Sequence, residues 1–112
     1  MKKYLLIPLL VLFMASCSSN APKDVTKNFL EALAKGKIDD AKKYASAPTA
    51  KFLEKIATIP GASEQMKQPD FKFTFVKESI EGDKATVTYK DQKGEEEDVE
   101  LIKEDGKWKV TH

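Results

Sequence analysis

Residues 71–111 alternate apolar and polar side chains in short runs, and each run ends in a turn sequence such as Glu81-Gly82-Asp83 or Glu104-Asp105-Gly106. A period of two is typical of strands with one buried face, and Asp-Gly is a strong hairpin signal. Because short turns can join only antiparallel neighbours, we predict a curved four-stranded antiparallel meander. The predicted strands cover residues 71–76, 85–90, 98–101 and 107–111, with Phe71, Phe73, Phe75, Ala85, Val87, Tyr89, Val99, Leu101, Trp108 and Val110 on the apolar face.

The apolar face of such a sheet needs a cover, and the preceding residues supply apolar side chains at helical spacing. We therefore expect an α+β fold in which about three N-terminal helices pack on one face of the sheet. Residues 62–69 show no clear period, and we expect a flexible polar connector there. The predicted helices run from Asn20–Pro22 to Gly36 (Val25, Phe29, Leu30, Leu33 inward), from Asp39 to Pro48 (Ala41, Tyr44, Ala45) and from near Thr49 to Pro60 (Phe52, Leu53, Ile56, Ala57).

The N-terminus has the order of an export signal. Lys2 and Lys3 precede an apolar run over residues 4–13, and small residues follow up to Cys17. This run is too short to span a bilayer, which takes roughly 20 apolar residues. Cleavage near Ser16 would leave an ordinary secreted protein, whereas cleavage directly before Cys17 would leave a cysteine for lipid attachment. Cys17 is the only cysteine and has no disulfide partner within the chain, which favours lipidation. The Ala-Ser-Cys sequence resembles the acceptor site of bacterial lipoproteins.

That resemblance divides the chain into a signal peptide (1–16), a lipidated tether (17–22) and one small domain (23–112). Stable anchoring takes two or more lipid signals, so we expect several acyl chains, palmitate among them, on Cys17. By analogy with lipoprotein sorting, Ser18 implies the outer membrane, and the lack of acidic residues directly after Cys17 implies a domain that faces the periplasm.

The charge balance excludes some partners. Loss of Lys2 and Lys3 with the signal peptide changes the formal charge from +1 to −1, which gives no bias toward nucleic acid. All 19 basic residues are lysines. The absence of arginine argues against bidentate recognition of phosphate or carboxylate.

The sequence offers little catalytic or metal-binding chemistry. The single histidine, His112, is the last residue, so neither a zinc cage nor a Cys-His pair is expected. The five glycines are scattered among turns rather than gathered in a phosphate-binding loop. The run Glu95–Asp98 could bind Ca²⁺ through carboxylates, but it lacks the usual loop spacing. We interpret it as a solvated strand end and expect no metal and no cofactor.

Four aromatic residues are candidates for a ligand pocket: Tyr44, Phe73, Tyr89 and Trp108. Aromatic side chains on the inner face of a sheet can bind a small apolar or aromatic ligand, although in a small domain they more often fill the core. A catalytic version of this pocket would need a buried aspartate or tyrosine as acid or base. Asp70, just before the first predicted strand, is the candidate by residue type.

Four segments carry a resemblance to a family of bacterial lipoproteins of unknown function with a cystatin-like, nuclear-transport-factor-2-like (NTF2-like) fold, some of which are labelled lumazine-binding-like. The resemblance extends over nearly all of the mature chain, and the residues that carry it are packing and turn residues, so it implies a fold rather than an activity. The segments are 25–33 running into Gly36, 41–44, 82–88 and 101–110.

We therefore expect a non-enzymatic envelope lipoprotein whose domain binds a partner protein or a modest ligand close to the membrane. The alternatives are a small-ligand binder with a cavity between helices and sheet, and a small isomerase-like enzyme. The outer face of the sheet is rich in Lys, Glu and Thr, which favours a monomer or a weak homodimer.

Overall fold

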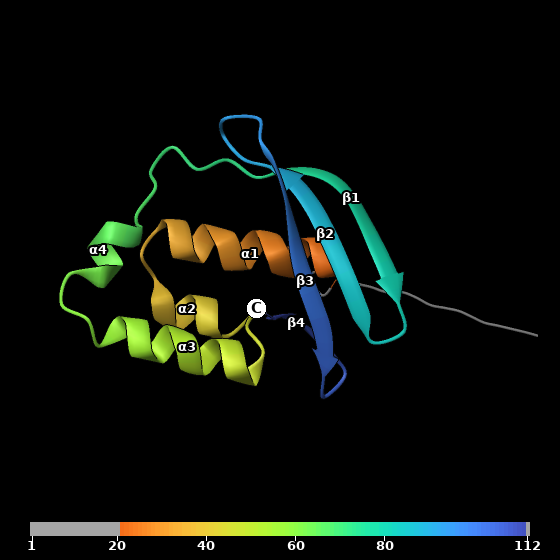
Figure 1. Cartoon of the computed structure of the whole chain (residues 1–112), viewed down its shortest axis with the longest axis horizontal. Coiled ribbons are helices and arrows are strands. Elements are labelled where there is room, and N and C mark those ends of the chain that lie inside the picture. Colours follow the sequence, from red (N-terminus) through yellow and green to blue (C-terminus); the bar gives the residue numbers. More distant parts are fainter. Residues whose placement is uncertain (1–20, 112) are drawn as a thin grey trace, which may run out of the picture.

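A computed structural model describes residues 21–111, so Cys17, the rest of the leader and tether, and His112 lie outside the described residues. The predicted α+β order is confirmed: helices come first, and a four-stranded antiparallel sheet in the order β1-β2-β3-β4 follows. Figure 1 shows the helices gathered on one side of this sheet. The elements are α1 (Pro22–Ala34), α2 (Ile38–Lys42), α3 (Ala47–Ala57), α4 (Ala62–Met66), β1 (Thr74–Glu81), β2 (Lys84–Lys90), β3 (Glu96–Glu104) and β4 (Lys107–Thr111).

Helix α1 begins and ends as its sequence predicts. Pro22 lies in the first turn, where its missing N–H costs no helical hydrogen bond. Gly36 follows the helix with φ +75°, a left-handed conformation that terminates helices and favours glycine. A Cβ at Gly36 would lie 2.7 Å from the carbonyl oxygen of Ser63, so the close approach of the α4 segment also requires glycine.

The prediction that the second helix extends to Pro48 is wrong, because α2 ends at Lys42. Residues 44–46 leave the helix and run beside β4, where the Val110 amide donates to the Tyr44 carbonyl and the Ser46 amide donates to the Val110 carbonyl, both at 2.8 Å. β4 is an edge strand, so its outer backbone groups lack a strand partner. Hydrogen bonds from residues 44–46 to these groups stabilise the fold more than one further turn would stabilise a helix as short as α2. Pro48 consequently lies in the first turn of α3 rather than at the end of α2.

The expected flexible connector contains a helix, α4. Ala62 is buried, and the amide of Gln68 donates to the carbonyl of Ala34 at 2.8 Å, which joins the end of this segment to the end of α1. The segment has too few apolar residues to show a helical period. Its order comes from these contacts with distant parts of the chain.

Strand β1 is displaced along the sequence from the prediction and contains a bulge. Phe71 and Phe73 precede it, and the register shifts between Phe75 and Lys77. Beyond the bulge Glu78 lies opposite Val87, on the inner face, and its carboxylate accepts a hydrogen bond from the backbone amide of Lys23 at 3.1 Å. A carboxylate is favourable at the N-terminus of α1. Phe75, expected inside, is 41% exposed, and the Lys23 ammonium lies 5.2 Å from the centroid of its ring.

The core lies between the helices and the inner sheet face. Its members among the described residues fall between residues 25 and 110, so residues 21–111 contain a hydrophobic core. No helix within these residues has the length and apolar character needed to cross a membrane. The buried apolar core consists of Val25, Phe29, Ala32, Ile38, Ala41, Ala45, Leu53, Ala85, Val87, Leu101 and Val110.

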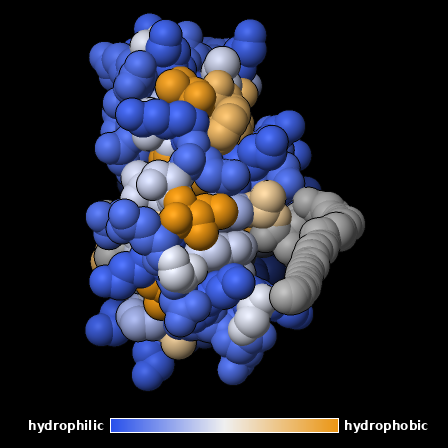
Figure 2. Space-filling model, turned by 90° about the vertical axis from the view of Figure 1, so that its right-hand side faces the viewer, coloured by the Kyte–Doolittle hydropathy of each residue, from blue (hydrophilic) through white to orange (hydrophobic). Residues whose placement is uncertain are grey.

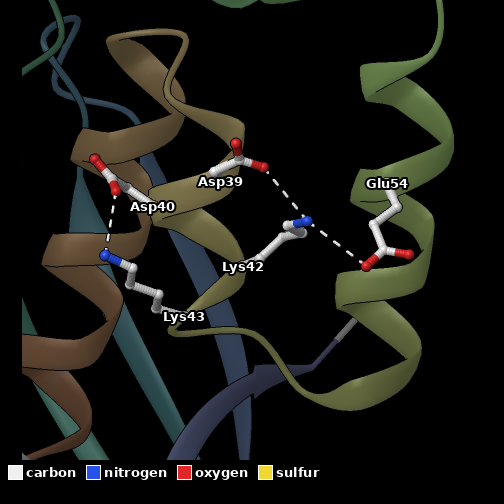
Figure 3. A network of polar contacts seen from close by, with 5 residues as sticks. All are labelled: Asp39, Asp40, Lys42, Lys43 and Glu54. Carbon is white, nitrogen blue, oxygen red and sulfur yellow. Dashed lines mark ion pairs between the residues drawn. The ribbon is translucent and has the colours of Figure 1, made fainter.

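Ion pairs join α2 to its neighbour on the surface. Figure 3 shows the Lys42 ammonium between Asp39 of the same helix, at 3.4 Å, and Glu54 of α3, at 3.6 Å. Lys43 pairs with Asp40 at 3.4 Å. Because each pair has at least one partner that is mostly exposed, each contributes at most about 1 kcal/mol, and the position of α3 depends mainly on its buried side chains.

Candidate functional site

A groove of about 490 Å³ lies between the helices and the β3–β4 side of the sheet. Its volume falls within the roughly 300–1,000 Å³ typical of small-molecule sites. Thr49, Asp98, Glu100 and Thr111 are its polar lining residues. We call it the apolar groove, and its apolar lining residues are Phe29, Leu30, Leu33, Phe52, Leu53, Ile56, Met66, Val99 and Val110.

Helix α3 supplies the most exposed apolar side chain of this groove. Phe52 is 54% exposed, whereas Leu53, the next residue, is 3% exposed. The prediction that both lie in the core is therefore wrong for Phe52. Successive helical residues point about 100° apart, so α3 can bury Leu53 against the sheet while Phe52 remains at the mouth of the groove.

A second hollow, of about 320 Å³, continues the apolar groove. The two share Leu30, Leu33 and Met66, so they form one trough along α1. The second part differs in character because it adds aromatic and carboxylate side chains. We call it the aromatic–acidic pocket, and it is lined by Leu30, Leu33, Ala34, Met66, Gln68, Phe71, Tyr89, Asp91 and Glu97.

Tyr89 is the aromatic centre of this pocket. Its ring stacks on that of Phe73, with centroids 5.2 Å apart and planes at 17°, and meets Phe71 edge-on at 6.3 Å. Burial raises the pKa of the Tyr89 phenol, and the negative charges of Glu97 and Asp91 raise it further. The phenol therefore stays protonated at neutral pH and lies in a negative potential.

Carboxylates form the other side of the pocket. Oxygen atoms of Asp91, Glu95 and Glu97 lie within 4.8 Å of one another and are the described group that could jointly hold a cation. Asp91 is already engaged, because its Oδ1 accepts from the amides of Lys93 at 2.8 Å and Glu95 at 3.0 Å. The acidic run 95–98 thus divides between two faces: Glu97 lies opposite Tyr89 on the inner face, while Asp98 accepts from Thr88 Oγ1 on the outer face at 2.6 Å.

The four predicted pocket aromatics do not line one cavity. Phe73 and Tyr89 lie together, but Tyr44 lines a separate polar hollow of about 310 Å³ beside α1 and α2. Trp108 is half-buried on β4 with the Lys103 ammonium 5.2 Å from its ring centroid. Asp70, the candidate acid or base, is exposed. The predicted lipidation site Cys17 lies outside the described residues.

Sequence reasoning assigned most of the groove residues to the core and missed Met66. The available signal was in α1, where Leu30 and Leu33 widen the apolar stripe beyond Val25 and Phe29. In the fold both are only half-buried. When the apolar stripe of a helix is wider than the sheet can cover, some of its side chains stay partly exposed, and such side chains can line a groove.

Among the described residues, β1 and the outer sheet face contribute a hollow of about 390 Å³ whose lining is mostly polar, with Ser79, Glu81 and Lys84 among its residues. Figure 2, which faces the right-hand side of Figure 1, shows a largely hydrophilic surface with small, separate hydrophobic patches. The exposed large apolar residues of β1 are Phe75, Val76 and Ile80. Scattered apolar side chains are ordinary on a soluble surface, so we place the candidate site in the trough.

Solved structures share this fold. A Campylobacter jejuni protein described as an NTF2-like transpeptidase aligns with a TM-score of 0.56 at 19% identity, over 81% of this chain and 97% of its own. A SEC-C motif containing protein from Rhodopseudomonas palustris aligns with a TM-score of 0.57 at 16% identity, over 85% of this chain and 78% of its own. No curated protein matches the chain significantly. The domain therefore has an NTF2-like fold, and because a family model matches residues 15–111, the chain belongs to the family described as "Domain of unknown function (DUF4878)".

Proposed function

We propose that this protein is a lipid-anchored envelope protein whose NTF2-like domain binds a small apolar ligand in the apolar groove. The observation that carries the proposal is the groove itself, about 490 Å³ with nine apolar lining residues. A ligand that covers these side chains gains roughly 25 cal/mol for each Å² of apolar surface removed from water. The domain acts as a binding module and not as an enzyme.

Phe52 supports a binding role more directly than the buried lining residues do. A phenylalanine that is 54% exposed contributes little to the core, yet it lies at the mouth of a concave apolar surface. Aromatic side chains offer large contact areas and are common anchors in binding sites. We assign Phe52 as the residue that covers one side of the bound ligand.

The anchor rests on the N-terminal sequence. Lys2 and Lys3, the apolar run of residues 4–13 and the single Cys17 together have the order of a lipoprotein leader. Only four residues separate Cys17 from Pro22, the first residue of α1. Lipid on Cys17 would therefore hold the groove close to the bilayer, in the outer membrane on its periplasmic side.

Metabolic labelling tests the anchor in the full chain. Cells that express the protein are grown with labelled palmitate, and the protein is then isolated and its label measured. We expect label in the parent protein and in the matched control Ser18→Ala, and none in Cys17→Ala. Label that persists in Cys17→Ala would contradict the anchor.

A separate measurement tests the groove. Residues 20–112, which contain the described core, are first checked for a cooperative thermal transition and then titrated with dodecyl maltoside below its micelle concentration. We expect Phe52→Ser to weaken binding roughly tenfold through lost apolar contact. The control is Ile80→Ser, which removes an apolar side chain of similar exposure (51%) from β1. Equal weakening by both variants, or no binding by the parent, would contradict the proposed site.

A further inference from the structure

The trough is chemically asymmetric along its length. Its apolar part has nine apolar lining residues and also two carboxylates, Asp98 and Glu100, of which Asp98 already accepts a hydrogen bond from Thr88. Its far part is lined by the rings of Phe71 and Tyr89 and by Asp91 and Glu97, and Glu95 brings a third carboxylate within 4.8 Å of these two. No lysine lines either part within residues 21–111, although the chain has 19 lysines. A cluster of three carboxylates therefore lies beside two aromatic rings at the far end, and no lysine of the described residues lines that end.

From this arrangement we infer that the ligand is an amphiphilic cation, an ammonium group on an aliphatic body. The ammonium binds in the aromatic–acidic pocket beside Glu97 and Tyr89, and the aliphatic body lies in the apolar groove. The inference rests on the proposed function and specifies the ligand class of the same site.

Each half of such a ligand meets the surface that suits it. An ammonium is attracted both to carboxylates and to the faces of aromatic rings, and the two attractions act together where both surround it. Asp91, Glu95 and Glu97 bring three carboxylates within 4.8 Å, so a bound cation also lowers their mutual repulsion. The raised pKa of Tyr89, caused in part by Glu97 and Asp91, reflects the same negative potential.

Two other ligand classes fit less well. An inorganic cation would use only the carboxylates and would leave the adjoining apolar groove open to water. A fatty acid would fill the apolar groove but would bring its own carboxylate to the negative end. The formal charge of residues 17–112 is only −1, so a strong preference for a cationic head group must come from local contacts and not from long-range attraction.

The test uses three probes with the same alkyl chain and different heads: dodecyltrimethylammonium, dodecyl maltoside and dodecanoate, each below its micelle concentration. Binding to residues 20–112 is measured by calorimetry. We expect the cation to bind roughly tenfold more tightly than the neutral probe, and the anion to bind most weakly. Glu97→Gln should lower the affinity for the cation to that for the neutral probe.

Glu96→Gln is the matched control. It makes the same charge change on the adjacent residue of β3, which lies opposite Lys90 and lines neither part of the trough. We expect all three affinities to stay within about twofold of the parent's, because charges on the solvated outer face are screened.

The outcomes separate this inference from the proposed function. Equal affinity for the cation and the neutral probe, with both lost in Phe52→Ser, would overturn the cationic ligand and leave the groove in place. A cation preference that survives in Glu97→Gln, or Ca²⁺ binding without alkylammonium binding, would also overturn it. Failure of every alkyl probe to bind would instead overturn the proposed function.

Discussion

Phe52 and Leu53 are consecutive residues of α3 with opposite environments: the first is 54% exposed and the second 3%. Both line the apolar groove, Leu53 from its buried wall and Phe52 from its mouth. One helical step thus separates a residue that stabilises the fold from a residue that is free to contact a ligand.

Truncation of these two residues should have different effects on stability. Leu53→Ala removes a buried side chain and should lower the free energy of unfolding by about 2–5 kcal/mol. Phe52→Ala should lower it by less than about 1 kcal/mol, because most of that ring already meets water. Chemical denaturation of residues 20–112 measures both. An equally large loss for Phe52→Ala would mean that Phe52 belongs to the core.

Gly36 should be less tolerant of substitution than Gly82. Both residues have positive φ, +75° and +61°, so alanine at either position is strained by roughly 1–2 kcal/mol. Only Gly36 has a neighbour in the way, the Ser63 carbonyl oxygen at 2.7 Å, while nothing lies within 4 Å at Gly82. We expect Gly36→Ala to lower the melting temperature clearly more than Gly82→Ala. Equal shifts would show that α4 can move aside at little cost.

Thr26 should tolerate loss of its hydroxyl. The residue is fully buried in α1, and its Oγ1 has no hydrogen-bond partner. Thr26→Val keeps the shape and removes the desolvated hydroxyl, so the protein should be as stable as before or more stable by about 1–2 kcal/mol. Thr26→Ser keeps the hydroxyl and removes the methyl group, and should be destabilising by about 1 kcal/mol. Thermal denaturation of the parent and the two variants measures the order of their stabilities. Strong destabilisation by Thr26→Val would contradict the finding that the Thr26 hydroxyl has no hydrogen-bond partner.

Tyr89 should make the fold sensitive to alkaline pH. Its folded-state pKa is raised above the ordinary value of 10.0 by burial and then by Glu97 and Asp91. As the pH rises past 10.0, the unfolded chain therefore loses the phenol proton first, and the free energy of unfolding falls until the folded pKa is passed. Below that range the stability is unaffected by this group. Tyr89→Phe should remove this component of the alkaline loss, measured by denaturation at a series of pH values on both sides of 10.0.

Much of the fold could be predicted because it depends on local patterns. The alternation in residues 84–90 and 107–111, with Asp105-Gly106 between the last two strands, determines strands, faces and an antiparallel order. The apolar spacing of α1 and the stop at Gly36 likewise depend on neighbours in sequence. The predicted leader before Cys17 likewise depends only on neighbouring residues, and the assignment of Cys17 as a lipid anchor stays a prediction.

The candidate site could not be predicted in the same way. Tyr44 and Trp108 are aromatic like Phe73 and Tyr89, yet only the latter two lie together. The predicted helix that included Tyr44 gave way to pairing with Val110, 66 positions later, which the local sequence does not encode.

The sequence by itself determined which residues are apolar, where the chain turns and hence the α+β order of elements, because propensity and periodicity act over a few residues. Tertiary structure decided which apolar residues remain exposed. The bulge at Phe75–Lys77 places Glu78 at the N-terminus of α1, and the limited contact of α3 with the sheet leaves Phe52 open beside the trough. Exposure depends on what packs against a side chain, and those partners come from distant parts of the sequence.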